Sequence, residues 1–335
     1  MAQAIGIIGA GGWGIALAKL LAEKGERVTL WCHGQEAYHD LQEKRESRTY
    51  LPGVIVPAAV QITRSLEQTV SNKGFIVCVV PSHAVRGVLV KTRPHTSRQT
   101  RIVCGTKGLE EESLKTMGEV LAEIFGECEK VLHAFLSGPT FALEVAQCLP
   151  AAVTVAAYSE EVAKEIQRVL STQTLRVYTS QDVIGVQMGG VIKNIIAIAS
   201  GISDGLGLGQ NARAALITRG LAEMTRLAVR MGADPLTLAG LPGVGDLILT
   251  CTGGLSRNRQ VGMHIAEGRS IEEIAHETQM VAEGIRNTRS VWLLARQLGV
   301  EMPIVEQMYR VIYEQKKPSE AVRNLMQRSL KPEKP

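Results

Sequence analysis

The chain has 335 residues, a length that predicts two domains with separate hydrophobic cores. Its 37 basic and 33 acidic residues give a net charge of +4, too small to favour a nucleic-acid partner, and the 4% of aromatic residues disfavours a surface on which bases stack. The six cysteines include no C-x-x-C pair, so we expect reduced core thiols and neither a disulfide framework nor a metal site.

The beginning of the chain shows no basic segment before its first strand, and no uncharged apolar stretch reaches membrane-spanning length. We therefore expect no signal peptide, no membrane span and a cytoplasmic location. Hydrophobic residues at 45% and charged residues at 21% are typical of a soluble globular protein.

Residues 4–32 combine a short apolar run, a glycine-rich turn, a helical pattern and a second apolar run. Gly9, Gly11 and Gly14 have the spacing G-x-G-x-x-G. In a dinucleotide-binding βαβ unit the first glycine permits a tight turn, the second lets the backbone approach a pyrophosphate, and the third lets the helix pack on the strand. The spacing alone is also compatible with a turn that binds nothing, but its strand–turn–helix–strand context favours a nucleotide.

His33 stands at the end of the second strand, where an NAD-restricted site carries Asp or Glu for the ribose 2′-hydroxyl. An imidazole does not repel a 2′-phosphate as a carboxylate does, so NADP(H) is permitted. Arg45 and Arg48 follow and offer two further cations, unless they are solvated helix charges. His33 as a surface histidine without a ligand is the alternative.

The rest of the first half alternates strand and helix patterns, which predicts an α/β, Rossmann-type, doubly wound and mostly parallel sheet. After about residue 181 the pattern is helical throughout, beginning with a nearly all-apolar helix at 182–200 that must be buried. We predict a dinucleotide-binding domain at 1–187 and an all-α substrate-binding and catalytic domain at 188–335. Further strands are expected at 60–63, 74–80, 101–105, 133–138, 151–157 and 175–180, and helices at 82–92, 112–125, 212–231, 258–267, 271–276, 284–298 and 303–314.

Lys193 is a charged residue inside the apolar helix at 182–200. Gly189, Gly190 and Ala197 are its neighbours at helical spacing, so this face has room for a ligand beside the ammonium group. Burial lowers a lysine pKa toward the range useful for proton transfer. A lysine that extends to the surface or pairs with an acid is the alternative. Asn194 is placed to orient a cofactor amide or another side chain.

Two loops follow predicted strands, where open α/β sheets bind ligands. In the first loop, Lys107 lies between glycines. It is expected to bind a ligand, and a turn lysine without a ligand is the alternative. Gly138 and Thr140 lie in the second, where Thr140 is expected either to cap a helix beginning near Phe141 or to expose that helix N-terminus to a substrate.

Residues 243–262 are rich in polar groups. Ser256 is expected to cap a helix whose first turn holds Arg257 and Asn258, a suitable place for a phosphate; a capped helix with solvated basic residues is the alternative. Asp246 is expected to accept a substrate proton or to pair with a lysine. Glu283 is a candidate hydrogen-bond partner for a ribose or nicotinamide group.

Seven segments in this order resemble the bacterial NAD(P)-dependent glycerol-3-phosphate dehydrogenase family: GAGGWGIALA, GTKGLE, SGPTFA, GVIKNI, GVGDLILTCTGG, SRNR and VAEGIRNT. The resemblance implies reversible reduction of dihydroxyacetone phosphate to sn-glycerol 3-phosphate with NAD(P)H, for glycerophospholipid synthesis, by a homodimer. It implies that Lys193 transfers the proton. The implied substrate contacts are Lys107, Gly138, Thr140, Lys193, Asp246, Ser256, Arg257 and Asn258. Besides the fingerprint glycines, the implied cofactor contacts are Gly12, Trp13, His33, Lys107, Ala142, Arg257, Val281 and Glu283.

The sequence departs from the family at two places. Gly12 and Trp13 replace the Ser-Tyr or Ser-Phe of many relatives, which removes a hydroxyl contact, and His33 replaces a common Arg, which leaves the NADP preference open. The alternatives are a β-hydroxyacid-type dehydrogenase, which the phosphate-suited surroundings of Arg257 disfavour, and a non-catalytic dinucleotide sensor, which has no need of a buried lysine.

Overall fold

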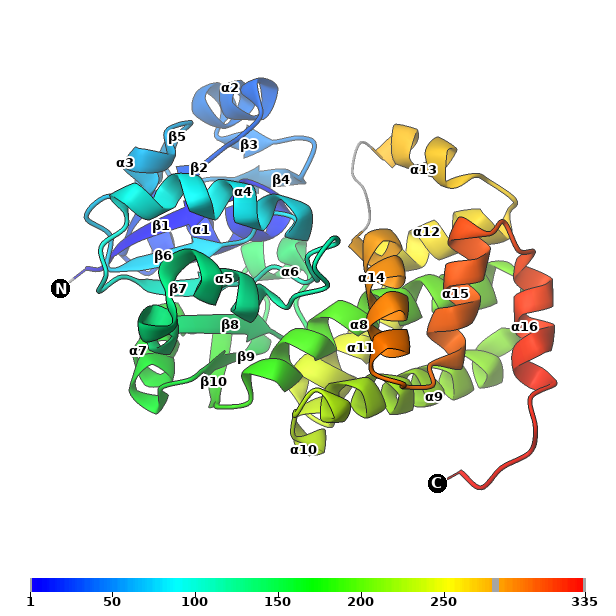
Figure 1. The fold of residues 1–335 in the computed structure, drawn as a ribbon. Helices are drawn as coiled ribbons and strands as arrows, with labels where there is room; N and C mark the ends of the chain where they lie inside the picture. Colours follow the sequence, from blue (N-terminus) through cyan, green and yellow to red (C-terminus); the bar gives the residue numbers. More distant parts are fainter. Residues whose placement is uncertain (1, 279–282, 334–335) are drawn as a thin grey trace.

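The structure is a computed structural model that describes residues 2–278 and 283–333. An α/β part is followed by a part whose described residues form helices and no strand, and the long helix α8 (Val183–Gly205) leads from one into the other (Figure 1). The predicted fold class is confirmed.

Within the described residues, the large sheet contains all eight predicted strands in the order β10-β9-β8-β7-β6-β1-β2-β5. Its neighbours are parallel except β8 and β9, so β9 and β10 run opposite to the other strands. The parallel strands end at one common edge, where ligands of such sheets bind. The bounds are β1 (Ala4–Ile8), β2 (Arg27–Trp31), β5 (Gln61–Thr63), β6 (Phe75–Cys78), β7 (Arg101–Cys104), β8 (His133–Ser137), β9 (Ala151–Ala157) and β10 (Leu175–Ser180).

A small antiparallel sheet of β3 (Glu46–Ser47) and β4 (Leu51–Ile55) was not predicted, because β3 is very short and β4 contains Pro and Gly. The helix predicted at 112–125 begins only at Met117, where Thr116 and Glu119 form a reciprocal capping box. The helices of the α/β part are α1 (Gly12–Glu23), α2 (Gln35–Lys44), α3 (Leu66–Val70), α4 (Ser82–Thr92), α5 (Met117–Phe125), α6 (Ala142–Ala146) and α7 (Glu160–Leu170).

The helical part surrounds α8, against which α9, α11, α12 and α14 pack. The short elements α10, η3 and α11 were not predicted, since each is too brief to show a clear helical period, and α16 was not predicted either. The bounds are α9 (Gly209–Arg230), α10 (Pro235–Leu238), a π-helical turn η3 (Leu241–Gly245), α11 (Asp246–Thr252), α12 (Arg257–Ala266), α13 (Ile271–Thr278), α14 (Glu283–Gln297), α15 (Pro303–Tyr313) and α16 (Pro318–Met326).

Helix α8 takes part in two hydrophobic cores. Val183 and Val186 pack with side chains of the sheet, whereas Met188 and Val191 pack with the surrounding helices. By length and composition, α8 and residues 235–252 are apolar enough to cross a membrane, but 89% of the α8 window is buried inside the protein. The burial of α8 fits a core helix that carries Lys193 into the interior.

Four of the six cysteines are buried, as expected, but Cys128 and Cys148 are exposed. Within residues 2–278 and 283–333, no group of three or more His, Cys, Asp or Glu side chains is arranged to hold a metal ion. The expectation that the protein uses no metal stays a prediction.

Candidate active site

The three fingerprint glycines have the three different surroundings expected of a phosphate-binding turn. Gly9 has φ +119°, which favours glycine. A Cβ on Gly14 would lie 1.8 Å from the carbonyl oxygen of Gly9, so helix and strand meet closely here. A Cβ on Gly11, the N-cap of α1, would meet no atom within 4 Å. The backbone of Gly11 is therefore open to a pyrophosphate at a helix N-terminus, and the turn fits a dinucleotide.

Other predicted cofactor residues lie around this turn. Gly12 is the first residue of α1, and a Cβ there would lie 3.5 Å from the Cβ of Ala142 in α6. The indole nitrogen of Trp13 would lie 3.4 Å from a Cβ on Gly105, which follows β7. The carboxyl ends of β1 and β7 and the beginning of α6 therefore meet beside the glycine turn.

His33 is exposed just beyond β2, with its ring centroid 5.5 Å from that of Trp31. Arg45 is not a solvated helix charge, since its guanidinium donates to three backbone carbonyls of residues 56–60. Arg48 is exposed.

Lys193, Lys107 and Asp246 form a cluster between the sheet and the helical part. Asp246 begins α11 and is completely buried, and Lys193 is 5% exposed. Each carboxylate oxygen of Asp246 accepts from one lysine: Oδ1 from Lys193 Nζ, and Oδ2 from Lys107 Nζ at 2.9 Å. Residues from the loop after β7, from α8 and from α11 thus meet in one ionic cluster.

One carboxylate shared by two lysines leaves the cluster with an excess of positive charge. Burial, reinforced by the charge of Lys107, lowers the pKa of Lys193 to about 7 although Asp246 opposes the change. Burial works to raise the pKa of Asp246, but the two lysines outweigh it and hold that pKa below its ordinary value. The cluster therefore contains an ionised carboxylate and an amine that can gain or lose a proton near neutral pH.

The expected room beside Lys193 is occupied by the protein itself. A Cβ on Gly189 would lie 2.2 Å from the carbonyl oxygen of Pro242, and one on Gly190 would lie 2.9 Å from Ser137 Oγ and 3.4 Å from Lys107 Cγ. The two glycines therefore admit the close approach of Lys107 and η3. The buried hydroxyl of Ser137 has no hydrogen-bond partner among the described residues, so it can bind a polar group that enters here.

The loop after β8 approaches this cluster from another side. Gly138 has φ +148°, and the ring of Pro139 would lie 3.6 Å from a Cβ on Gly245, immediately before Asp246. The expected cap by Thr140 is wrong: its hydroxyl donates to the carbonyl of Gly138 at 3.2 Å, and α6 begins without a side-chain cap.

The start of α12 agrees with the expected arrangement. Ser256 Oγ accepts from the backbone N–H of Arg259 at 3.3 Å and caps the helix. Arg257 and Asn258 are its first two residues, at the end where a helix attracts an anion. The Arg259 side chain donates to Asp204 of α8 at 2.7 Å, which holds this end of α12 in place.

Asn194 orients another side chain, one of its two expected roles. Its Oδ1 accepts from Asn258 Nδ2 at 3.0 Å, and Asn258 Oδ1 accepts from the backbone N–H of Gly284 at 3.1 Å. These bonds connect α8, α12 and α14 beside Lys193.

Sequence reasoning missed Ser82 and Asn287. Ser82 binds both carboxylate oxygens of Glu283, and Asn287 Nδ2 donates to the carbonyl of Lys107 at 2.9 Å. The available signal for Ser82 was its place at the start of a helix, in the segment that follows β6. Val281 lies outside the described residues.

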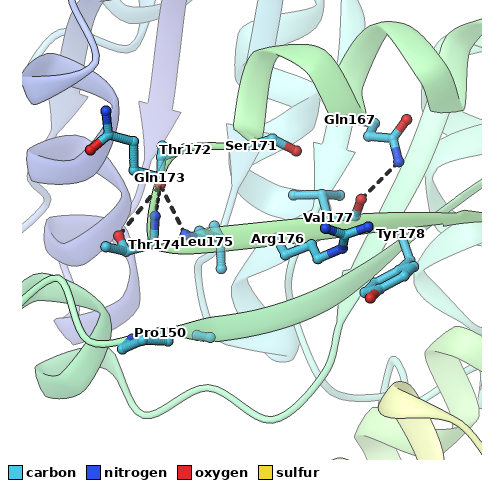
Figure 2. A pocket seen from close by; sticks show the side chains of 11 residues that line it. Pro150, Gln167, Ser171, Thr172, Gln173, Thr174, Leu175, Arg176, Val177 and Tyr178 are labelled. Carbon is cyan, nitrogen blue, oxygen red and sulfur yellow. Dashed lines mark hydrogen bonds between the residues drawn. The ribbon is translucent and has the colours of Figure 1, made fainter.

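A surface hollow of about 460 Å³ lies at the β9–β10 edge of the sheet, away from these residues (Figure 2). Gln167 of α7 donates to the Val177 carbonyl there at 2.7 Å, and Arg176 is the only charged residue among those lining the hollow. It contains no predicted site residue, and it lacks a group suited to proton transfer.

Comparison with known proteins agrees with the geometry. A family model described as NAD-dependent glycerol-3-phosphate dehydrogenase N-terminus matches residues 4–163, and one described as the C-terminus matches residues 182–323. The chain is similar to a glycerol-3-phosphate dehydrogenase (NAD(P)+) of Citrifermentans bemidjiense, with 51% identity over 333 residues and 99% of each chain covered. It is 52% identical over 333 residues to the same-named protein of Geobacter sp. strain M21, again with 99% of each covered. The crystal structure of glycerol-3-phosphate dehydrogenase from Coxiella burnetii is similar with a TM-score of 0.93 and 41% identity, covering 98% of this chain and 99% of that one.

Proposed function

The chain belongs to the NAD-dependent glycerol-3-phosphate dehydrogenase family, and on this basis we propose that it reversibly reduces dihydroxyacetone phosphate to sn-glycerol 3-phosphate with NAD(P)H. It is then an oxidoreductase that acts on a CH–OH group. The observation that carries the proposal is the buried cluster in which Lys193 and Lys107 share the carboxylate of Asp246.

The cluster supplies the proton that a carbonyl reduction needs. When bound, a nicotinamide would supply the hydride for the ketone carbon, or accept it in the reverse direction. Lys193 gives a proton to the oxygen of that carbon, so one C–H and one O–H bond replace the carbonyl π bond. Because the pKa of Lys193 is about 7, the same amine can donate in reduction and accept in oxidation. Lys107 adds positive charge where an alkoxide develops.

The start of α12 holds the substrate phosphate. Arg257 offers a planar fork of donors, and the positive end of the ten-residue helix adds to its attraction. Asn258 is oriented by Asn194. A grip on the phosphate, away from the reacting carbon, fixes the orientation of the ketone, so it contributes to turnover as well as to affinity. Gly138, Thr140 and Ser256 complete the substrate contacts in this proposal.

Residues 1–187 form the dinucleotide-binding domain in this proposal, and residues 188–335 the substrate domain. The change of core partners between Val186 and Met188 supports this division. The turn of Gly9, Gly11 and Gly14 would hold the pyrophosphate, and Glu283 would contact the cofactor from the helical part. His33, Trp13, Ala142 and Val281 are further cofactor contacts in this proposal.

Family membership also supports three proposals about the cellular role: a cytoplasmic location, a homodimer, and supply of the glycerol phosphate backbone for glycerophospholipid synthesis. These proposals rest on the resemblance alone.

The test is an assay of NAD(P)H absorbance with the purified chain. We expect dihydroxyacetone phosphate to be reduced and sn-glycerol 3-phosphate to be formed. Oxidation of a β-hydroxyacid, with no reaction of the phosphorylated ketone, would instead support the β-hydroxyacid dehydrogenase alternative. Binding of NADPH without its consumption would support the sensor alternative.

A further inference from the structure

Arg64 lies at the sheet edge where the adenosine ribose of a dinucleotide is expected. Strand β5 pairs in parallel with β2, with Thr63 opposite Trp31. The residues after these two strands therefore emerge side by side, and Arg64 neighbours the loop of residues 32–34. The indole N–H of Trp31 donates to the carbonyl of Arg64 at 3.0 Å and fixes this backbone.

The Arg64 guanidinium reaches across that loop. It donates to the side-chain oxygen of Gln35, the first residue of α2. Burial raises the pKa of the Cys32 thiol, and the positive charge of Arg64 opposes that change. The side chain is exposed. A guanidinium thus lies on the solvent side of the β2–α2 connection, bound by a neutral amide and, among the described residues, by no acid.

Two of the other cations in this region are bound elsewhere, whereas Arg48 is exposed. The guanidinium of Arg45 is bound to backbone carbonyls, and Lys44 pairs with Asp40 at 2.6 Å.

The loop itself reads Cys-His-Gly, so it has no carboxylate to accept a ribose 2′-hydroxyl. A guanidinium matches the geometry and charge of a phosphate. We propose that Arg64 binds the 2′-phosphate of NADP(H) and makes NADPH the preferred cofactor of this chain. The inference rests on the proposed function, because it requires the dinucleotide to lie at this edge.

The test uses two adenosine fragments that need no turnover: 2′,5′-ADP, which carries the 2′-phosphate, and 5′-AMP, which lacks it. Calorimetry with the full-length protein should show tighter binding of 2′,5′-ADP. Arg64→Gln should weaken 2′,5′-ADP about ten- to a hundredfold and change 5′-AMP less than about twofold. Gln keeps the backbone carbonyl that accepts from Trp31.

Arg27→Gln is the matched control, since Arg27 is an exposed arginine at the opposite end of β2; it should leave both fragments unchanged. Arg64→Lys keeps the positive charge but loses the planar pair of donors, so its affinity for 2′,5′-ADP should lie between those of the wild type and Arg64→Gln. This variant replaces Arg64→Gln if the glutamine variant folds poorly.

Equal binding of the two fragments by the wild type, or an equal effect of Arg64→Gln on both, would overturn the inference. A chain that discriminates the fragments through Arg64 but does not reduce dihydroxyacetone phosphate would refute the proposed function and leave this inference standing. If the chain reduces dihydroxyacetone phosphate but shows no preference for NADPH and no effect of Arg64→Gln, the proposed function would stand and this inference would be refuted.

Discussion

Ser82, the first residue of α4, gives both of its donors to the carboxylate of Glu283, the first residue of α14. The backbone N–H donates to Oε1 at 3.1 Å and the hydroxyl to Oε2 at 3.0 Å. The two residues are 201 positions apart in the chain. Burial raises the pKa of Glu283, and the bonds from Ser82 oppose that change. Ser82 therefore positions a predicted cofactor residue and joins the sheet edge to the helical part.

Ser82→Ala should raise the KM for NAD(P)H about two- to tenfold, because Glu283 loses one hydrogen bond while the backbone bond remains. The kcat should change less than the KM. Steady-state kinetics with varied NAD(P)H measures both values. Ser97→Ala, which changes an exposed serine remote from Glu283, is the control. A change in thermal stability without a change in KM would show that Ser82 acts on the fold alone.

Lys193→Met should bind dinucleotide normally and lose about 10²–10⁴-fold in kcat, the range expected when a general acid–base group is removed. Binding is measured by the fluorescence of NADPH. Lys164→Met, which removes an exposed lysine of α7, is the control. Retention of the wild-type rate by Lys193→Met would refute the proton-transfer role.

The pH profile of the wild type tests the same amine without a variant. Reduction uses protonated Lys193, so its rate should fall as the pH rises through about 7, whereas oxidation uses the neutral amine and should become faster. Because Asp246 raises the pKa of Lys193, Asp246→Asn should move both limbs to lower pH. If the rates of reduction and oxidation changed in the same direction with pH, Lys193 would not be the group that transfers the proton.

Arg257→Ala should raise the KM for dihydroxyacetone phosphate about ten- to a hundredfold and change the KM for NAD(P)H much less, because the guanidinium is assigned to the substrate phosphate. Arg230→Ala is the control, because it removes one exposed arginine at the end of α9, and it should leave both KM values unchanged. Equal effects on both KM values would move Arg257 to the nucleotide site.

Two fingerprint glycines should respond differently to the same substitution. Gly11→Ala adds a methyl group to open space, so the melting temperature should be unchanged while the affinity for dinucleotide falls. In Gly14→Ala the methyl group would lie 1.8 Å from the carbonyl oxygen of Gly9, so the free energy of unfolding should fall by about 1–3 kcal/mol or more. Urea unfolding and calorimetric titration separate the two effects, and a stable Gly14→Ala variant would contradict this account of the packing.

Local sequence determined the elements that depend on neighbouring residues. The eight strands of the large sheet, the glycine turn and the burial of α8 follow from apolar periodicity and from the sterics of short segments. Ser256 was identifiable as a cap because its bond partner, Arg259, is three residues away. The early start expected for α5 and the expected cap by Thr140 were wrong because the boundaries of a helix depend on a single turn, where several starts have similar local energies.

Tertiary structure decided what surrounds Lys193. Its partner Asp246 is 53 positions away, and Lys107 joins them from the end of β7. The small residues on α8 were expected to leave room for a ligand, and in the fold Gly189 and Gly190 admit η3 and Lys107. The antiparallel pairing of β8 with β9 and the bond between Ser82 and Glu283 were likewise invisible locally. Such contacts join segments that are far apart in the sequence, and the hydrophobic pattern of each segment does not show which other segment it meets. The partners are determined by the surfaces that become buried against each other when the chain folds.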